Sequence, residues 1–408
     1  MKFFQLKTVS ETYELIEQHV SSITQNEILP IAKSNGRILF VDYYSLENIP
    51  SFQRSSVDGF AVRASDTFGA SESMPGFLTL MGRVEMGQEV LTSLNPGQTM
   101  YVPTGGMLPA NTDAMLMIEH AEENDDLICA YKQVAPLENV IQIGEDYSKG
   151  TLLFKKGTKL RAQEIGALAA NGITEVSVYR KPIIAYFSTG DEIVPSDSFD
   201  LPIGKIRDMN AITLETTARE MGCDFIYGGI VEDEGDVLQR TAEEFLDKAD
   251  CLILSGGSSV GTKDYSVEVL DSLGSPGVYV HGISIKPGKP TILGSANGKP
   301  VIGLPGHPAS ALVIFQTIGL KIINRLRGAT ESSVTSVFAK SSKKIASAVG
   351  RTDYIRVKLT KKDGYYSAEP VHGKSGLIST LVNCNGLLYI PENKEGIEKD
   401  EVAEVILQ

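Results

Sequence analysis

The most suggestive chemistry in this chain is a long run of residues without acidic side chains. No Asp or Glu occurs from Ser272 to Thr330, a span of 59 residues, whereas the chain average of 51 acids in 408 residues would put about seven there. The net charge of the chain is −13, so this local positive charge favours an anion-binding site, with a solvated basic face as the alternative. The basic residues of the run are Lys286, Lys289, Lys299, Lys321, Arg325 and Arg327.

Polar or glycine-rich loops follow five predicted strands. Two lie in the acid-free run, at Lys286–Lys289 (KPGK) and Pro305–Ser310 (PGHPAS). The others are Ser188–Glu192 (STGDE), Glu232–Glu234 (EDE) and Ser255–Gly261 (SGGSSVG). A single Gly/Pro loop is most often only a turn. Five loops at one sheet edge favour a binding cleft, because open α/β sheets bind ligands outside the carboxyl ends of their strands.

The loop that begins at Ser255 suits a phosphorylated ligand. Gly256 and Gly257 leave backbone N–H groups accessible to an anion, and Ser258 and Ser259 add hydroxyl donors. Nearby carboxylates would repel that anion unless a divalent cation lay between them, which predicts Mg²⁺; the alternative is that they cap helices or lie in solvent. These carboxylates are Asp191, Glu192, Asp233 and Asp264. No GxxxxGK[ST] or GxGxxG motif follows a predicted strand, so an ordinary NTPase or dinucleotide enzyme is not indicated.

Composition limits the protein class and its location. Hydrophobic residues make up 42% of the chain and charged residues 22%, which predicts two to four globular domains. No stretch approaches the roughly 20 apolar residues that a membrane span needs, and no signal segment is recognisable, so a cytoplasmic location is expected. The acidic net charge argues against binding to nucleic acid or to a membrane surface. The four cysteines include no CxxC pair, which indicates neither disulfides nor a zinc site.

Residues 1–178 are predicted to be mostly β. A capping box at Thr8–Glu11 begins a helix that runs to about Val20, and a second helix is predicted over Ile28–Asn35. Short β-branched runs follow from about Val41 to Val178, interrupted by a helix over Arg161–Asn171.

Residues 179–329 are predicted to form a doubly wound domain with a mostly parallel sheet. Its predicted strands are Pro182–Phe187, Asp224–Val231, Cys251–Leu254, Val278–Ile285 and Pro300–Leu304. Its predicted helices are Asn210–Met221, Glu234–Lys248 and Ala309–Leu326. Residues 335–408 return to short alternating strands, typical of a small β-barrel or sandwich. The predicted fold class is therefore α/β and multidomain, with the doubly wound domain flanked by a β-rich N-terminal region and a small C-terminal β-barrel.

Taken together, these motifs resemble those of the molybdopterin molybdenumtransferase family over essentially the whole chain. They occur in the family's order: RSSVDGFAVR, VPTGG, NTDAM, IGEDYSKG, FSTGDEIV, IRDMN, SGGSSVGTKD, KPGKPT, GLPGHPASAL, GRTDYIRV and GKSGLIST. The resemblance implies insertion of molybdate into adenylylated molybdopterin with a divalent cation, here Mg²⁺, and release of AMP and the molybdenum cofactor. It also implies that the first 178 residues form two interleaved subdomains, one of them discontinuous.

The resemblance further implies which residues bind and react. The molybdate pocket would consist of Lys289, Pro290, Ser310, Arg351 and Ser375, with Lys286 beside it. The residues for the cation and for anhydride cleavage would be Asp264, Asp233, Ser259 and Glu192, the first two as metal ligands. The residues that approach from the partner subunit of a homodimer would be Asp58, Thr104 and Asp146. A molybdopterin adenylyltransferase is the candidate partner enzyme.

Four residues depart from the family pattern: His307 stands for the usual Asn, Ser255 for Thr, Ser258 for Val or Ile, and Asn111 for Gly. His307 would make oxyanion binding depend on pH, since an imidazole titrates near pH 6.5; the alternative is a neutral hydrogen-bonding substitute for Asn.

Three other functions stay open: tungstate insertion, a non-catalytic scaffold or molybdopterin-binding protein, and a nucleotide-cleaving enzyme of the same fold. Retention of Asp58, Asp233, Asp264, Lys289 and Arg351 argues against the scaffold.

Overall fold

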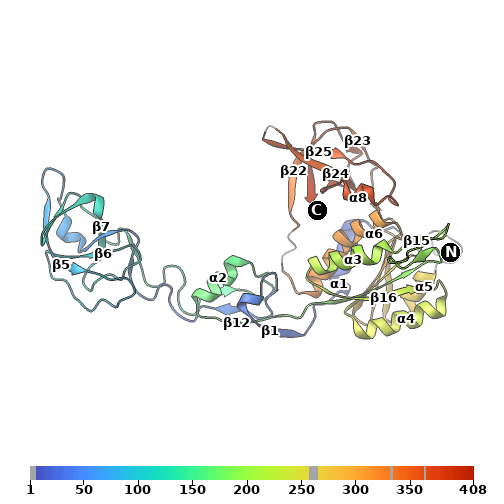
Figure 1. The fold of residues 1–408 in the computed structure, drawn as a ribbon, viewed down its shortest axis with the longest axis horizontal. Helices are drawn as coiled ribbons and strands as arrows, with labels where there is room; N and C mark the ends of the chain where they lie inside the picture. The colour runs from blue at the N-terminus through green and yellow to red at the C-terminus, as the bar shows by residue number, and fades with distance from the viewer. Residues whose placement is uncertain (1–5, 257–264, 331–333, 363) are drawn as a thin grey trace.

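The computed structural model describes residues 6–256, 265–330, 334–362 and 364–408. The chain is elongated (Figure 1). A six-stranded sheet in residues 59–130 lies at one end, and strand pairs around α2 (Ala162–Ala170) form a middle body. The α/β domain lies at the other end, with the C-terminal strands beside it. The predicted α/β multidomain class is confirmed.

The α/β domain is built on a six-stranded sheet in the order β16-β13-β17-β21-β20-β18. The first four strands are parallel to one another, and β20 is antiparallel to both of its neighbours. The strands are β13 (Ile183–Thr189), β16 (Asp224–Val231), β17 (Cys251–Ser255), β18 (Pro276–His281), β20 (Ile292–Ala296) and β21 (Lys299–Leu304). The carboxyl ends of all strands except β20 therefore lie at one edge of the sheet. This is the edge at which the five loops were predicted to form a binding cleft.

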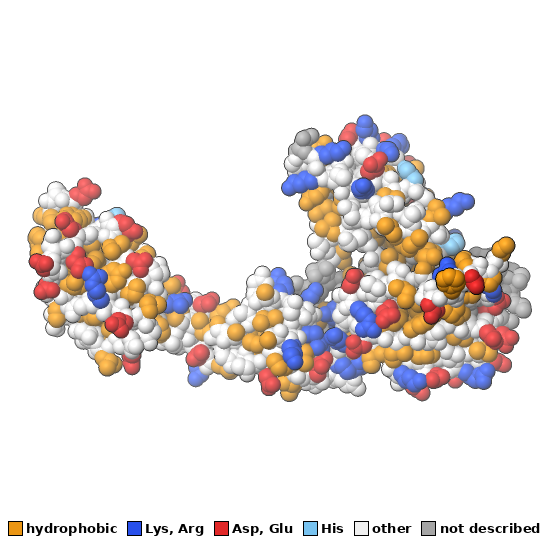
Figure 2. Space-filling view, in the orientation of Figure 1, with side chains coloured by type: hydrophobic (Ala, Val, Ile, Leu, Met, Phe, Trp, Pro, Cys, Tyr) orange, Lys and Arg blue, Asp and Glu red, His pale blue; other side chains and the backbone are white. Residues whose placement is uncertain are grey.

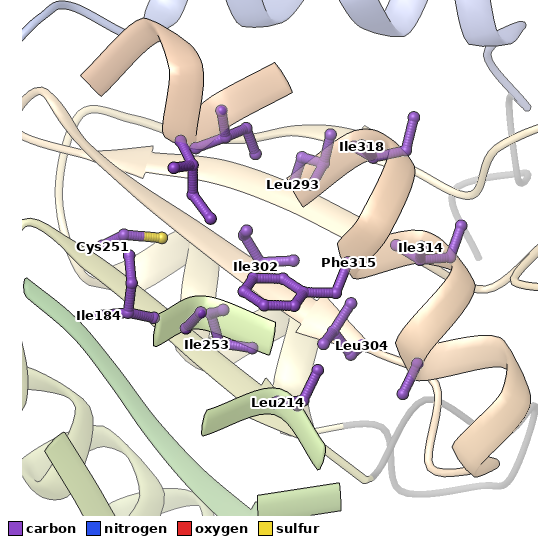
Figure 3. Close-up of a cluster of buried hydrophobic side chains, with 14 of the residues drawn as sticks. Ile184, Leu214, Cys251, Ile253, Leu293, Ile302, Leu304, Ile314, Phe315 and Ile318 are labelled. Atoms are coloured by element: carbon purple, nitrogen blue, oxygen red, sulfur yellow. The ribbon is translucent and has the colours of Figure 1, made fainter. Parts of the chain in front are cut away.

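Helices cover both faces of this sheet. They are α3 (Met209–Glu220), α4 (Gly235–Lys248), α5 (Tyr265–Ser272) and a continuous run of α6 (Pro308–Ile314), η4 (Phe315–Gly319) and α7 (Leu320–Leu326). On one face, Ile253 and Ile302 pack against Phe315 of η4 (Figure 3). On the other face, the core includes Leu238 of α4. The N-terminal α1 (Val9–His19) begins with the predicted capping box and buries Ile16 in the first core, so the start of the chain packs on the α/β domain.

The run Pro308–Leu326 corrects one expectation from the sequence. Its 19 residues are long and apolar enough to cross a membrane. An 18-residue window within them has a mean hydropathy of 1.3, but 67% of this window is buried inside the structure. Phe315, Ile318 and Ile322 are at most 1% exposed. The apolar residues of this helix are thus explained by the core that they form.

Segments far apart in sequence pair in the middle body. The pairs are β1 (Asn26–Pro30) with β12 (Glu175–Tyr179) and β2 (Tyr43–Tyr44) with β11 (Leu152–Phe154). A further pair, β3 (Arg54–Ser55) with β10 (Val140–Ile141), belongs to the six-stranded sheet's body, since Val140 shares a core with Ala61. In the sequence, the segment between β3 and β10 forms the sheet of order β7-β4-β6-β5-β9-β8. Its strands are β4 (Gly59–Val62), β5 (Gly76–Arg83), β6 (Gln98–Val102), β7 (Ala114–Met117), β8 (Ala121–Asn124) and β9 (Leu127–Ala130). The middle body is therefore discontinuous in sequence, with the six-stranded sheet inserted into it.

The predicted helix Ile28–Asn35 is wrong. Asn26–Pro30 is the strand β1, and only Ile31–Lys33 is helical, as a short 3-10 turn (η1). Pairing with β12 gives the backbone of β1 its partners, and this non-local contact overrides the local pattern. By contrast, α2 begins after Arg161 as predicted, since its signals are local.

The C-terminal strands close into a barrel. The order is β24-β25-β22-β28-β26, and β26 pairs again with β24. The strands are β22 (Ser336–Ser341), β24 (Thr352–Lys362), β25 (Tyr365–Pro370), β26 (Gly386–Ile390) and β28 (Val402–Leu407). The predicted strand Val278–Ile285 is divided, because Ile285–Lys286 forms a separate strand, β19, that pairs in parallel with β24. A segment of the α/β domain thus extends the barrel sheet.

Candidate active site

A cavity of about 500 Å³ lies between the α/β domain and the barrel. Its size is within the range of small-molecule sites. It is lined by all six residues predicted for the oxyanion: Lys286, Lys289, Pro290, Ser310, Arg351 and Ser375. The structure therefore brings these residues together, from both domains, into one site.

The KPGK loop is positioned by a strand and a glycine. In the parallel register of β19 with β24, Lys286 lies beside Asp353. Gly288 has a φ of +106°, and a Cβ there would meet Cγ1 of Ile314 at 2.2 Å, so glycine is required where the loop passes α6. Thr291 closes the loop, since its backbone N and its hydroxyl donate to the carbonyl of Gly288 at 3.2 and 2.7 Å.

The barrel contributes a second loop, residues 371–375. The carbonyl of Ser375 accepts from the backbone N of Ala309 at 3.1 Å, and its Oγ lies 3.1 Å from Nδ1 of His307. His307 is the N-cap residue of α6. His307, which departs from the family pattern, therefore contacts Ser375, a residue predicted to bind the oxyanion.

Three basic side chains of the cavity were not predicted from the sequence: Arg356, His372 and Lys374. Nη2 of Arg356 donates to the carbonyl of Gly373 at 3.1 Å, which holds the second loop, and burial lowers the pKa of this guanidinium. Arg356 and Lys374 belong to the motifs GRTDYIRV and GKSGLIST, so their charges were visible in the sequence. The cavity is more cationic than predicted.

Only part of the acid-free run faces this cavity. Lys321 and Arg325 pair with Glu17 of α1. They line a different cavity, where the middle body meets the α/β domain and Lys and Arg side chains gather (Figure 2). Lys299 and Arg327 donate to backbone carbonyls of neighbouring segments. The expectation that the six basic residues of the run serve one anion site is thus corrected. Of these six, only the two lysines of the KPGK loop line the cavity between the α/β domain and the barrel.

At the carboxyl edge of the sheet, Gly256 leads into the loop predicted to bind phosphate. Its φ is +117°, and a Cβ there would meet the carbonyl oxygen of Thr189 at 1.9 Å, so only glycine fits beside β13. Glu192 and Asp233 follow β13 and β16 in the chain, at the same edge. The other predicted residues of this edge lie outside the described residues: Gly257, Ser258, Ser259 and Asp264.

A buried polar network lies under this edge and was not predicted. Asp208, the N-cap residue of α3, is 3% exposed and accepts from the hydroxyls of Ser188 at 2.6 Å and Tyr227 at 2.8 Å. The hydroxyl of Tyr186 contacts those of Ser188 and Ser255. Burial raises the pKa of both tyrosines, which keeps them protonated as donors. The network ties α3 to β13, β16 and β17 at the start of the glycine-rich loop.

Asp58 and Thr104 lie together, but not at the cavity. Oδ1 of Asp58 accepts from the backbone N of Thr104 at 2.9 Å. Both residues adjoin strands of the six-stranded sheet, which lies at the opposite end of the chain from the barrel (Figure 1). Asp146 is in the middle body, where its backbone N donates to the carbonyl of Ile49 at 3.0 Å. A single chain does not bring these three residues to the cavity.

Comparison with known proteins accounts for the whole architecture. Family models match in three consecutive parts: the MoeA N-terminal region (domain I and II) over residues 7–172, a probable molybdopterin binding domain over residues 185–325, and the MoeA C-terminal region (domain IV) over residues 339–408. The molybdopterin molybdenumtransferase of Nostoc is 32% identical, over 91% of this chain and 86% of that protein. That of Bacillus subtilis is 31% identical, over 95% and 91%. The chain belongs to the molybdopterin molybdenumtransferase family.

Solved structures of this family share the fold. The molybdopterin biosynthesis MoeA protein of Pyrococcus horikoshii has a TM-score of 0.86 at 29% identity, covering 99% of this chain and 100% of that one. A second structure from this organism has a TM-score of 0.78 at 37% identity, covering 99% of each chain. The family resemblance drawn from the motifs is confirmed, and the chain is an enzyme of molybdenum cofactor biosynthesis.

Proposed function

We propose that this enzyme inserts molybdate into adenylylated molybdopterin, with cleavage of the phosphoanhydride and release of AMP and the molybdenum cofactor. The proposal is carried by the cavity between the α/β domain and the barrel, which Lys286, Lys289 and Arg351 line. A doubly charged tetrahedral oxyanion suits such a site, because ammonium and guanidinium groups supply charge-assisted hydrogen bonds. The hydroxyls of Ser310 and Ser375 add neutral donors.

The glycine-rich loop after β17 is the proposed phosphate-binding element. Gly256, at its start, permits an approach of backbone that no other residue allows, and successive backbone N–H groups can bind an anion. Its continuation contains the proposed substrate-binding and catalytic residues Gly257, Ser258, Ser259 and Asp264. Binding the anhydride here and the oxyanion in the cavity would hold two anions together, and this proximity is the main proposed source of catalysis.

Magnesium fits the donor chemistry of this sheet edge. Asp233 and Asp264 are the proposed ligands, since Mg²⁺ prefers oxygen donors and is commonly bound by one or two carboxylates together with substrate phosphates. When bound, Mg²⁺ would neutralise charge on the phosphate oxygens. Glu192 is the further proposed catalytic carboxylate of this edge.

We further propose that Asp58, Thr104 and Asp146 act across the interface of a homodimer. All three residues are exposed, and they lie in bodies away from the cavity of their own chain (Figure 1). A second copy could therefore bring them to the site that its partner builds from the α/β domain and barrel. The proposed enzyme is cytoplasmic, and a molybdopterin adenylyltransferase is the proposed source of its substrate.

The test is an insertion assay with purified protein, adenylylated molybdopterin and Mg²⁺, with and without molybdate. We expect AMP release to require molybdate and to coincide with activation of an apo-molybdoenzyme. AMP release without molybdate would instead identify a nucleotide-cleaving enzyme, and binding without AMP release would identify a scaffold. Competition between molybdate and tungstate distinguishes the two oxyanions, and a chelator arm tests the metal requirement.

A further inference from the structure

We infer that Asp353 is a positioning residue, which orients the guanidinium of Arg351 toward the oxyanion cavity. The inference rests on the proposed function, because it assigns a role within the proposed oxyanion site. Asp353 lies in the motif GRTDYIRV, and the sequence predicted no role for it.

The two side chains form a bidentate ion pair. Nε of Arg351 donates to Oδ1 of Asp353 at 2.6 Å, and Nη2 donates to Oδ2 at 3.0 Å. The side chain of Asp353 has no exposed surface, whereas that of Arg351 is 33% exposed and lines the cavity. The carboxylate is thus inside the protein, and the guanidinium is at the cavity wall.

This geometry leaves a defined set of donors for a ligand. A guanidinium has five N–H groups in a planar fork, and Asp353 accepts from one on Nε and one on Nη2. The other three belong to Nη1 and Nη2, which form the end of the fork. That end can donate to two oxygen atoms of a tetrahedral oxyanion at once. Asp353 therefore determines which edge of Arg351 is available to the oxyanion.

The backbone around the pair is fixed by the junction of the two domains. Asp353 lies in β24 beside Lys286 of β19. Ser284 holds the chain on both sides of Arg351: its hydroxyl donates to the carbonyl of residue 350, and its carbonyl accepts from the backbone N of Thr352 at 3.0 Å. With its backbone held and its buried partner fixed, the guanidinium has a preorganised direction.

A carboxylate close to an anion site has two opposite effects on affinity. As a negative charge it repels the anion, so removing its charge would tighten oxyanion binding. As an orienting partner it preorganises the guanidinium, so removing its charge would weaken binding. The burial and bidentate pairing of Asp353 favour the second effect, because Arg351 already compensates the carboxylate charge. The sign of the change therefore distinguishes the two roles.

The experiment measures binding of molybdate alone to the full-length wild type and to Asp353→Asn by calorimetry. We expect the Kd for molybdate to rise about tenfold in the variant. In the insertion assay, the KM for molybdate should rise by a similar factor while kcat is retained, a split that a general loss of folded protein would not produce. Glu369→Gln is the matched control, because it removes the same charge from an exposed ion pair of the same barrel, and it should bind molybdate like the wild type.

Arg351→Gln and the double variant complete a double-mutant cycle. If Asp353 acts through Arg351, adding Asp353→Asn to Arg351→Gln should change the Kd by less than about twofold. An unchanged or lower Kd in Asp353→Asn alone would overturn the inference and leave the proposed site intact, whereas a wild type that fails to bind molybdate would overturn both. Should Asp353→Asn fail to fold, Asp353→Glu, which keeps the charge but displaces the carboxylate by one methylene, replaces it with the same expected rise.

Discussion

Nδ1 of His307 lies 3.1 Å from Oγ of Ser375, and this contact joins the N-cap of α6 to the barrel. A carboxamide can make the same contact. We expect His307→Asn to change the half-saturating molybdate concentration by less than about twofold, because the carboxamide keeps the contact with Ser375. His307→Leu cannot make the contact and should raise that concentration about fivefold. Molybdate titration of the insertion assay measures both, and equal effects of the two substitutions would assign the contact no role.

Lys289→Ala should raise the molybdate requirement roughly 10- to 100-fold. The substitution removes a charge-assisted hydrogen bond to the oxyanion, on the order of 1.5–3 kcal/mol. AMP release as a function of molybdate concentration measures the change. Lys299→Ala is the control, because Lys299 belongs to the same acid-free run but donates to the carbonyl of Leu246 outside the cavity. An unchanged requirement in Lys289→Ala would move the oxyanion to another site.

Asp264→Ala should abolish AMP release and leave molybdopterin binding measurable, since the proposed metal ligand acts on the anhydride and not on the pterin. Single-turnover AMP release and equilibrium binding of molybdopterin separate the two effects. Asp247→Ala, which removes an exposed carboxylate of α4, is the control and should turn over normally. Wild-type turnover by Asp264→Ala would exclude this carboxylate from the mechanism.

Asp208→Ala should lower the free energy of unfolding of the α/β domain by about 3 kcal/mol, because it leaves buried hydroxyl donors without their acceptor. Tyr227→Phe removes only one donor to Asp208 and should cost about 1 kcal/mol. Denaturant-induced unfolding, monitored by hydrogen exchange in α3, measures both losses of stability. Equal stability of Asp208→Ala and the wild type would mean that the network does not hold this edge of the sheet.

Glu164→Gln should destabilise α2 in a pH-dependent manner. The side chain of Arg161 and the backbone N of the same residue donate to Glu164, and this ion pair lowers the pKa of the carboxyl below its usual 4.5. A carboxyl whose pKa is lowered by folding stabilises the protein above the unfolded pKa, and this contribution is lost as the pH falls through the folded pKa. We expect a loss of about 1 kcal/mol at neutral pH that shrinks below pH 4.5.

Hydrogen exchange in α2 at neutral and acidic pH measures this difference, and hydrogen exchange in α4 measures the control. Glu244→Gln, which breaks an exposed pair with Lys248 on α4, is the control and should cost no more than about 0.5 kcal/mol. A loss in Glu164→Gln that is independent of pH would assign the effect to packing.

The strands of the α/β domain were predictable where an apolar run precedes a helix. The predicted strand Asp224–Val231 has the same bounds as β16. Its β-branched and aromatic residues are followed by a clear helix pattern, which marks where the strand ends. The strand β20 (Ile292–Ala296) was missed. It is antiparallel to β18 and β21 and no helix separates it from β21, so the alternation that reveals parallel strands does not apply to it.

The site was predictable to the extent that its residues lie in compact motifs. The KPGK loop and Arg351 are examples, and the cavity contains them. Asp353 could have been found, because it follows Arg351 by only two residues in the motif GRTDYIRV. Asp208, the N-cap residue of α3, could not, since its partners Ser188 and Tyr227 lie in two separate strands, β13 and β16. Charge counting failed for Lys321, whose partner Glu17 is near the other end of the chain.

The pairing of β19 with β24 makes the barrel share backbone hydrogen bonds with the α/β domain. An occupant of the cavity would contact both domains, so its binding free energy would add to the free energy that keeps them associated. Filling the site should therefore increase the cooperativity of unfolding. A protein whose two domains melt separately without oxyanion should melt in a single transition when the oxyanion is saturating.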